Sequence, residues 1–326
     1  MKQAKIIGTG AYLPKKVLTN ADLEKMVETS DEWIVSRTGM RERRIAAEDE
    51  YTSDMGLAAA KKAIEKSKID AKSIDLILVA TLTPDYIFPS TACLIQSKLG
   101  IEAAAMDIQA ACSGYIYGLS IAKAFIEAGL YHNILVIAAE KLSSIVDYED
   151  RTTCILFGDG ASACIVSNEG KGLVIRDTVL GADGDQTEIL KMPAGGSRNP
   201  ASKETVEAKM HYIKMGGTEV FKHAVRRMES SSKECIERAG LQESDINWLI
   251  PHQANIRIID AIAKRFQVPN ERVFITVGKY GNTSASSVGI ALDELLEEKE
   301  LSSGDNILLT AFGAGLTWGS TVLTHE

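Results

Sequence analysis

The sequence has no apolar run long enough to cross a membrane. Its longest apolar runs, such as LILVAT (76–81) and NILVIAA (133–139), are far shorter than the roughly 20 residues that a membrane-spanning helix needs. The first ten residues, MKQAKIIGTG, also lack the pattern of a secretory signal. We therefore expect a cytoplasmic protein with no membrane insertion.

Cysteine is also scarce, and acidic residues outnumber basic ones, 44 to 36. The five cysteines are odd in number, scattered and without a C-x-x-C pair, so neither a disulfide framework nor a zinc site is indicated. A formal net charge of −8 argues against nucleic acid as a partner, because phosphate binding needs a dominant basic face. We expect reduced thiols and neither a metal nor nucleic acid.

Nucleotide-binding motifs are missing as well. The stretch GTGAYLP (8–14) has two glycines of a dinucleotide fingerprint, but Leu13 occupies the third place and Pro14 follows it. There is no P-loop and no H-E-x-x-H motif. Neither ATP nor a metal is therefore required.

The chain does contain an internal repeat. Residues 62–81 align with 234–253 at an offset of 172, and residues 115–140 align with 288–313 at an offset of 173. Each aligned stretch reads as an amphipathic helix, a polar turn and an apolar strand. A unit of this length indicates a duplicated α/β domain rather than a solenoid, and 326 residues suit two such halves.

The repeat predicts the main elements of both halves. Apolar strands joined by helical crossovers indicate buried sheets that are mostly parallel. We expect helices over residues 53–67, 112–128, 218–239, 255–266 and 284–298. Residues 181–204 are loop-like and are expected to lie over the surface.

Cys112 is the first candidate for chemistry. It lies between the strand-like run AAAMDIQAA (103–111) and a helix, among small residues that let a substrate carbonyl approach closely. A thiol at a helix start meets unpaired backbone N–H groups that favour the thiolate and so make a nucleophile. The alternative, which this position leaves equally open, is a buried and inert cysteine.

His252 and Asn282 are the second and third candidates. His252 follows an apolar strand in WLIPHQAN (248–255), where α/β proteins often place their sites, although a lone loop histidine is more often structural. Asn282 lies in YGNTSASS (280–287), which also fits a plain turn followed by a Ser or Thr helix cap. The repeat brings this stretch opposite Cys112, so that two helix starts would share one pocket. Thiol, imidazole and carboxamide together suit acyl transfer.

A glycine-bearing loop near the C-terminus completes the set. In FGAGLTWGS (312–320), backbone N–H groups could form an oxyanion hole with that of Cys112, and Ala314 can contribute its own if its φ is not positive. The motifs DIQAACSG, HQAN, GNTSASS and FGAGLTWGS, in this order, resemble those of β-ketoacyl-acyl carrier protein synthase III, the initiating condensing enzyme of type II fatty acid synthesis. The similarity covers nearly the whole chain.

The resemblance implies a fold and a reaction. The fold is the thiolase-like αβαβα arrangement of two duplicated halves, here 1–172 with the nucleophile and 173–326 with the histidine and asparagine. The reaction is the decarboxylative condensation of acetyl-CoA, or a similar short acyl-CoA, with malonyl-acyl carrier protein to give acetoacetyl-carrier protein, CoA and CO₂. Cys112 would carry the acetyl group, while His252 and Asn282 would assist decarboxylation; Cys112 and Ala314 would form the oxyanion hole. CoA thioester is then a substrate and not a resident cofactor.

The same resemblance implies binding surfaces. In TSDEWIVSRTG (29–39), Thr29 or Ser30 can cap a short helix that Gly39 ends, which sets Trp33 and Arg37 on one face; alone, the pair would read as a surface tryptophan covered by an arginine stem. The residues expected to bind CoA are Thr29, Trp33, Arg37, Arg151, Phe221 and Asn255. Those expected to bind the acidic carrier protein are Gln253, Ala254, Arg257, Lys222, Lys264 and Arg265. The run RERR (41–44) is expected to be solvated or paired.

The family also implies a homodimer, in which Phe88 of the loop PDYIFPSTAC (84–93) would reach the neighbouring acyl pocket. Leu316 is expected on the floor of that pocket, where many relatives have Phe. Three rival functions stay open: a chalcone-synthase-like or quinolone-type condensing enzyme, a papain-like cysteine hydrolase, and a non-catalytic CoA-binding or scaffold protein of the same fold.

Overall fold

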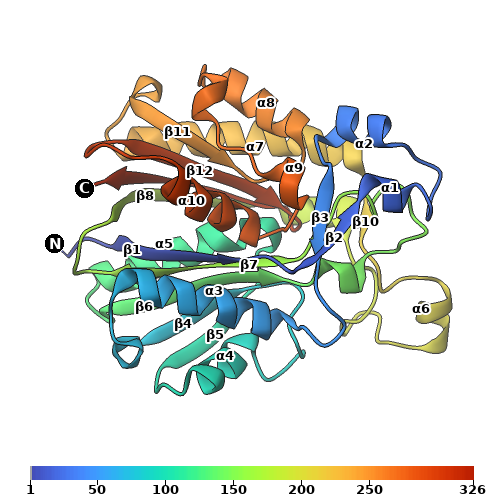
Figure 1. Ribbon diagram of the computed structural model, residues 1–326, viewed down its shortest axis with the longest axis horizontal. Helices are drawn as coiled ribbons and strands as arrows, with labels where there is room; N and C mark the ends of the chain where they lie inside the picture. The colour runs from blue at the N-terminus through green and yellow to red at the C-terminus, as the bar shows by residue number, and fades with distance from the viewer. Residues whose placement is uncertain (1) are drawn as a thin grey trace.

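The protein is built around one long mixed sheet (Figure 1). The computed structural model describes residues 2–326, and within them the main sheet has nine strands in the order β11-β12-β13-β8-β1-β7-β6-β4-β5. In sheet order these strands are Ile246–Pro251, Asn306–Gly313, Thr317–His325, Leu173–Ala182, Lys5–Tyr12, Gly160–Ser167, Asn133–Glu140, Leu76–Ala80 and Ala104–Ile108.

The sheet repeats one pattern about its middle. From β1 outwards, β7 and β6 pair antiparallel and β4 is parallel to β6. From β8 outwards, β13 and β12 pair antiparallel and β11 is parallel to β12. The two runs join only through Lys5 and Ile6 of β1, which pair with Val174 and Leu173 of β8. The repeat in the sequence is thus a repeat in the sheet.

Helices form three layers around the strands (Figure 1). One outer face is covered by α3 (Thr52–Ser67) and α4 (Thr91–Leu99), and the opposite one by α7 (Gly217–Arg238) and α8 (Ile256–Arg265). Between them, α5 (Gly114–Glu127) and α10 (Ser286–Glu298) contact strands of both runs. This is the expected αβαβα layering, and each helix layer has its own buried apolar cluster.

Close packing explains some of the glycines. A Cβ on Gly10 of β1 would lie 2.5 Å from the Ala59 carbonyl oxygen of α3, so only glycine lets this helix approach the sheet so closely. The same strand face is otherwise covered by the small alanines of α3, among them Ala59, Ala60 and Ala63. Small residues therefore set the spacing of this outer layer.

Shorter elements surround the site end of the layers. Two small sheets pair β2 (Lys16–Thr19) with β3 (Glu42–Ile45), and β9 (Leu190–Lys191) with β10 (Lys214–Met215). The short helices are α1 (Asn20–Leu23), α2 (Asp31–Thr38), α6 (Lys203–Glu207) and α9 (Val277–Tyr280). The single 3₁₀ turns are Ala71–Ser73, Ala111–Ser113, Leu142–Ile145, Gly184–Ile189, Glu243–Asp245 and Asn270–Arg272.

The five long helices expected from the sequence are confirmed to within two or three residues at each end. The expectation of mostly parallel sheets is wrong, because five of the eight neighbouring strand pairs among residues 2–326 are antiparallel. The reason is local: β12 and β13 are joined by residues 314–316 alone, which form a hairpin connection and need no helical crossover.

Two further observations concern charge and hydropathy. Arg43, expected to be solvated or paired in a salt bridge, is instead fully buried and bonded to neutral groups. It donates to Asn20 Oδ1 at 2.6 Å and to the Ile155 carbonyl oxygen, and burial lowers its pKa to about 10. It ties the β3 segment to the loop before β7. Across residues 2–326, none of the helices is both long and apolar enough to span a bilayer.

Candidate active site

Cys112 lies at the entrance to the middle layer. The chain leaves β5, turns through Ala111–Ser113 and continues directly as α5, which confirms the expected strand-to-helix position. Ala111 has a φ of 44°, an uncommon value for a residue with a side chain. A Cβ on Gly313, the last residue of β12, would lie 2.6 Å from the Cys112 nitrogen. The C-terminal loop is therefore packed directly against Cys112.

The starts of α5 and α10 meet, as the repeat predicts. A Cβ on Gly114 would lie 3.3 Å from the Cβ of Ala285, which precedes α10. Ser284 Oγ lies 3.4 Å from Cys112 Sγ and donates a hydrogen bond to it. The two halves of the chain therefore contribute to one site.

This site opens into a large cavity of about 1140 Å³. Cys112, His252, Asn282 and Ala314, the residues that the sequence nominates for chemistry, all line it. Ala314 has no positive φ, which was the condition for its N–H to serve an oxyanion hole. Cys112, His252 and Asn282, which span 170 positions of the sequence, thus line the same cavity as the loop that carries Ala314.

His252 is held in one orientation just after β11. Its ring is buried, and Nδ1 lies 2.6 Å from Ser287 Oγ, which also accepts the Gln253 N–H at 3.3 Å. Because Ser287 accepts from that N–H, we assign its own hydrogen to Nδ1, so the ring hydrogen lies on Nε2. Burial lowers the His252 pKa to about 3. The imidazole is therefore neutral.

Asn282 has a defined orientation as well. Its Oδ1 accepts the Ser284 N–H at 2.9 Å, which leaves Nδ2 as the donor of this side chain, and its backbone bridges to Phe157. The alternative of a Ser or Thr cap in this stretch is wrong, because α10 begins after Ala285 without a side-chain cap. Asn282 lies in a tight turn in which its side-chain Nδ2 is left to donate to a ligand.

The expectation of a low pKa for Cys112 is not met. Burial raises the pKa of this thiol to about 12; the Ser284 hydrogen bond opposes that effect, and the nearby Glu140 carboxylate adds to it. Desolvation disfavours the thiolate more than the helix start was expected to favour it. Cys112 is therefore a thiol at neutral pH and would have to lose a proton to react.

Most residues expected to bind CoA lie around the mouth of the cavity. Trp33, Arg37, Phe221 and Asn255 line it. Ser30, rather than Thr29, caps α2 by accepting the Trp33 N–H at 3.2 Å, and Gly39 ends the helix with a φ of 78°. The Arg151 guanidinium lies 5.2 Å from the centre of the Trp33 ring. Thr29 is not among the lining residues.

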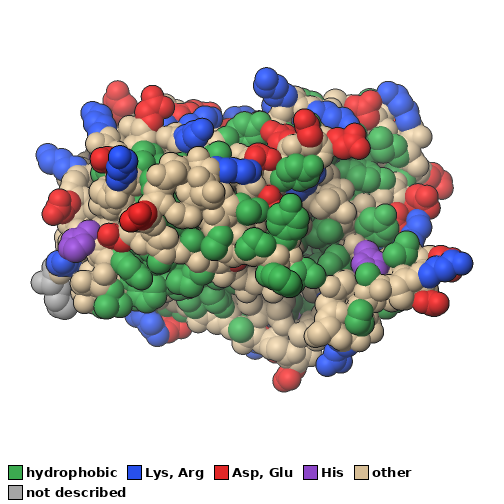
Figure 2. Space-filling view, turned by 90° about the horizontal axis from the view of Figure 1, so that it is seen from below, with side chains coloured by type: hydrophobic (Ala, Val, Ile, Leu, Met, Phe, Trp, Pro, Cys, Tyr) green, Lys and Arg blue, Asp and Glu red, His purple; other side chains and the backbone are tan. Residues whose placement is uncertain are grey.

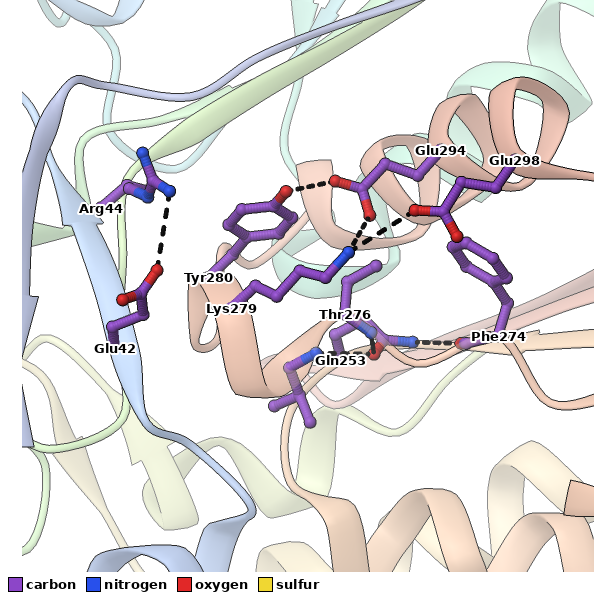
Figure 3. A network of polar contacts seen from close by, with 10 residues as sticks. Glu42, Arg44, Gln253, Phe274, Thr276, Lys279, Tyr280, Glu294 and Glu298 are labelled. Carbon is purple, nitrogen blue, oxygen red and sulfur yellow. Dashed lines mark hydrogen bonds and ion pairs between the residues drawn. The ribbon is translucent and has the colours of Figure 1, made fainter. Parts of the chain in front are cut away.

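The residues expected to bind a carrier protein divide into two groups. Arg257, Lys222, Lys264 and Arg265 are exposed, and the first two reach the cavity rim together with Ala254. Gln253 does not fit that role, because it is buried and its amide is used entirely by the backbone. It donates to the carbonyls of Pro251 and Phe274 and accepts from the N–H groups of Thr276 and Val277 (Figure 3).

Gln253 instead belongs to a network that holds the Asn282 segment. Figure 3 shows it beside α9, whose Lys279 and Tyr280 reach carboxylates of α10. Lys279 Nζ lies 3.3 Å from Glu294 and 3.6 Å from Glu298, and the Tyr280 hydroxyl donates to Glu294. These contacts tie the loop after β11 to α9 and α9 to α10, and Asn282 lies between α9 and α10.

Of the two residues expected in an acyl pocket, only Leu316 lies elsewhere than expected. Leu316 is completely buried in the apolar cluster next to α7 and α8 and does not line the cavity. Phe88 is 84% exposed and is not among the residues that line this chain's own cavity. Its contact with a neighbouring molecule stays a prediction.

Sequence reasoning missed part of the site. Residues 181–204, expected only to cover the surface, supply Thr187, Leu190, Met192 and other lining residues of the cavity. Ser284 and Ser287 were read as turn residues, although the first contacts Cys112 and the second His252. The run of three serines in GNTSASS was the available signal, since so many hydroxyls at a buried helix start need partners.

The chain matches known families over both halves. Residues 106–184 match 3-oxoacyl-[acyl-carrier-protein (ACP)] synthase III, and residues 236–325 match the C-terminal part of 3-oxoacyl-[acyl-carrier-protein (ACP)] synthase III. The beta-ketoacyl-[acyl-carrier-protein] synthase III of Chlamydia muridarum is 63% identical over 323 residues, which is 98% of this chain and 99% of the relative. That of Caldanaerobacter subterraneus subsp. tengcongensis is 56% identical over 321 residues, 98% of this chain and 97% of the relative.

Solved structures of related enzymes have the same fold as this chain. The 3-oxoacyl-[acyl-carrier-protein] synthase III from Aquifex aeolicus VF5 superposes with a TM-score of 0.90 at 50% identity, covering 99% of this chain and 100% of that one. The priming β-ketosynthase from the R1128 polyketide pathway has a TM-score of 0.90 at 34% identity, covering 100% and 97%. The thiolase-like fold of two repeated halves and the identity over the full length lead to one conclusion: the chain belongs to the β-ketoacyl-acyl carrier protein synthase III family.

Proposed function

We propose that the protein catalyses the initiating condensation of fatty acid synthesis, in which a short acyl-CoA and malonyl-acyl carrier protein give a β-ketoacyl-carrier protein, CoA and CO₂. The observation that supports this most is the convergence of Cys112, His252 and Asn282 on one cavity with a tryptophan and arginine mouth.

The first half-reaction is acyl transfer to Cys112. The Sγ atom attacks the thioester carbonyl, the new S–C bond forms, and CoA leaves as its thiolate. The N–H groups of Cys112 and Ala314 are our candidates for the donors to the oxyanion, because β12 ends against the nucleophile. Such a donor contributes roughly 3 to 4 kcal/mol to the transition state.

The second half-reaction is the loss of CO₂ from malonate. The enolate oxygen that develops is stabilised by hydrogen-bond donors, which do not have to transfer a proton to it. Two side chains can supply these donors. His252 is neutral and carries its hydrogen on Nε2, and Asn282 has an Nδ2 group that the turn does not use. The carbanion then attacks the acyl group on Cys112, and the cysteine sulfur leaves.

The binding surfaces follow from the cavity mouth. Trp33 and Arg37, with Arg151 beside Trp33, suit the adenine and phosphates of CoA, and Phe221 and Asn255 line the same cavity. The exposed cations of α7 and α8 suit an acidic carrier protein whose prosthetic arm enters by the same mouth. CoA is then exchanged and no permanent cofactor is needed. The five free cysteines suit a reducing cytoplasm.

A homodimer completes the proposal. Strand β5 ends the sheet with an exposed edge that carries Met106, and the loop before α4 exposes Tyr86, Ile87 and Phe88. Figure 2, taken from the side on which α4 lies in Figure 1, shows hydrophobic side chains spread over this face and charged ones mainly at its edges. A long unpaired edge beside an apolar patch calls for a partner, and a second copy would satisfy both.

The test is intact-mass and peptide analysis after exposure to acetyl-CoA, branched acyl-CoAs and longer acyl-CoAs. We expect a thioester on Cys112 alone among the five cysteines, and none in Cys112→Ser; the acyl group that accumulates identifies the primer. Adding malonyl-carrier protein should then release the β-ketoacyl product. A protein that condenses equally well with free malonyl-CoA would be of the chalcone-synthase type, and one that never acylates would be a binding protein.

A further inference from the structure

The two candidate donors to the oxyanion come from segments that are far apart in the sequence. The Cys112 N–H lies in the turn before α5, and the Ala314 N–H comes directly after the last residue of β12. Such donors act only when both lie about 2.7 to 3.1 Å from the position of the developing oxyanion. The two segments must therefore be held at a fixed distance from each other.

Thr317 and Ser113 link these segments by hydrogen bonds on either side of Cys112. The Thr317 hydroxyl donates to the Ala110 carbonyl oxygen at 2.8 Å, and the Ser113 hydroxyl donates to the Thr317 carbonyl oxygen at 3.1 Å. Each bond uses a hydrogen of its own, and the two run in opposite directions between the segments. Both ends of the turn that carries the thiol are therefore tied to Thr317.

Thr317 also contacts the residue that carries the second donor. Its Oγ1 lies 3.0 Å from the Ala314 carbonyl oxygen, so the hydroxyl lies between the carbonyl oxygens of Ala110 and Ala314. A hydroxyl has one hydrogen, which we assign to the Ala110 oxygen because that acceptor is nearer. No hydrogen of this side chain is then left for a ligand in the cavity.

The outer side of the loop is held without Thr317. Leu316 and Asp183 exchange two backbone hydrogen bonds of 2.8 Å each, and Leu316 is completely buried. The Asp183 carboxylate in turn accepts from Arg227 Nη2 of α7 at 2.9 Å. Loss of the Thr317 hydroxyl should therefore release the loop only on the side that faces Cys112.

Resting on the proposed function, we propose that Thr317 is a positioning residue for acyl transfer: its hydroxyl holds the Ala314 N–H at the distance from the Cys112 N–H that a thioester oxyanion requires. Thr317 acts through these two N–H groups. It therefore affects how fast a carbonyl carbon is attacked and not how reactive the thiol itself is. A reaction of Cys112 that forms no oxyanion should be insensitive to it.

Two reactions of the same thiol separate these effects. An acetyl thioester is attacked at its carbonyl carbon, and its oxygen becomes negative before the thiolate leaves. Iodoacetamide is attacked at its CH₂ carbon, and iodide leaves without an oxyanion. Peptide mass analysis measures both rates at Cys112. The thioesters are acetyl-CoA and S-acetyl-N-acetylcysteamine, a short thioester that lacks the nucleotide.

Thr317→Val keeps the shape of the side chain and removes the hydroxyl. We expect acylation by both thioesters to fall about 10- to 100-fold, because a displacement of about 1 Å at the reacting groups costs up to the larger factor. KM for acetyl-CoA and the alkylation rate should stay near their wild-type values. Thr317→Ser, which restores the hydroxyl, should recover most of the acylation. Equal losses in acylation and alkylation, or wild-type acylation in Thr317→Val, would overturn the proposal.

Thr321 offers a matched control on the same strand. It is fully buried in β13, and its hydroxyl has no hydrogen-bond partner among residues 2–326. Thr321→Val removes a hydroxyl of the same kind without breaking a link to the turn of Cys112, so both reactions should proceed at wild-type rates. A loss of acylation as large as that in Thr317→Val would show that the effect is not specific to Thr317 and would refute the proposal.

A second variant keeps the test decisive if Thr317→Val does not fold. Ser113→Ala removes the longer of the two links, so it should slow acylation several-fold and leave alkylation unchanged, whereas equal losses would again contradict the proposal. The proposed function would fail in a different way. The wild type would then take no acetyl group from acetyl-CoA, while the short thioester and iodoacetamide would still compare Thr317→Val with the wild type.

Discussion

At the scale of single residues, Asn282 offers a direct test of the division of labour. Asn282→Asp keeps the oxygen that accepts the Ser284 N–H but loses the Nδ2 donor. We expect this variant to form acetyl-Cys112 at near the wild-type rate and to lose decarboxylation by roughly 100- to 1000-fold, the usual effect of removing one such donor. Single-turnover acylation and CO₂ release measure the two steps. Equal loss in both would contradict the assignment.

His252 predicts a pH effect on stability. Its pKa is about 3 in the fold and about 6.5 when unfolded, so between these values only the unfolded chain takes up the proton and stability falls as pH falls. From pH 6.5 to 5 this contribution is about 2 kcal/mol. Glu140, whose pKa is raised in the fold, acts in the opposite sense and masks it.

The prediction is therefore a difference between proteins. The free energy of unfolding of His252→Gln, measured by denaturant titration at pH 6.5 and 5, should fall by about 2 kcal/mol less than that of the wild type. His132→Asn, which removes an exposed imidazole, is the control. An identical pH dependence in His252→Gln and the wild type would show that the buried imidazole is not kept neutral.

At the scale of elements, the end of β12 sets the position of the nucleophile. Gly313→Ala places a methyl group 2.6 Å from the Cys112 nitrogen, closer than any relaxed contact, so the turn before α5 must shift. We expect acylation to fall by at least 100-fold, since a displacement of about 1 Å has that effect. Gly184→Ala, where nothing lies within 4 Å, should acylate normally. Acylation rates and melting temperatures of both variants test this prediction, which normal acylation by Gly313→Ala would contradict.

Helix α8 carries the docking prediction. Arg257 is exposed at the first turn of α8, and Asn255 caps this helix by accepting the Arg257 N–H at 2.8 Å. Charge reversal in Arg257→Glu should raise KM for malonyl-carrier protein several-fold and leave self-acylation from acetyl-CoA nearly unchanged, because the acidic carrier protein is repelled most. Lys203→Glu, on the distant α6, serves as a control of equal charge change. Equal loss in both half-reactions would exclude this surface.

At the scale of the whole molecule, the exposed loop before α4 predicts dimerisation. Ile87 and Phe88 are 88% and 84% exposed, which is unusual for apolar side chains of this size. Ile87→Asp combined with Phe88→Asp should convert a dimer into a monomer and change the range of acyl-CoAs accepted. Sedimentation and primer competition measure the two effects. Val206→Asp, at another exposed apolar position on α6, should stay dimeric, whereas a monomeric wild type would contradict the prediction.

Much of the fold was accessible from the sequence, and for a physical reason. Helix periodicity and turn residues are local properties, so the long helices and the cap and end of α2 were found close to their observed bounds. The sequence repeat predicted two similar halves, and similar halves bury equivalent faces of their helices and strands. Whether neighbouring strands run parallel or antiparallel could not be predicted in this way. It depends on connections such as residues 314–316, which show no periodicity.

By itself the sequence determined which groups are proposed to react: a thiol before a helix, a histidine after a strand and an asparagine in a tight turn, in a motif order specific to one family. Only the tertiary structure decided their ionisation and their partners. Burial, which no residue carries alone, keeps Cys112 protonated and His252 neutral, and it moves Gln253 and Leu316 out of the roles expected of them. Desolvation depends on everything packed around a group, and that is settled only when distant segments meet.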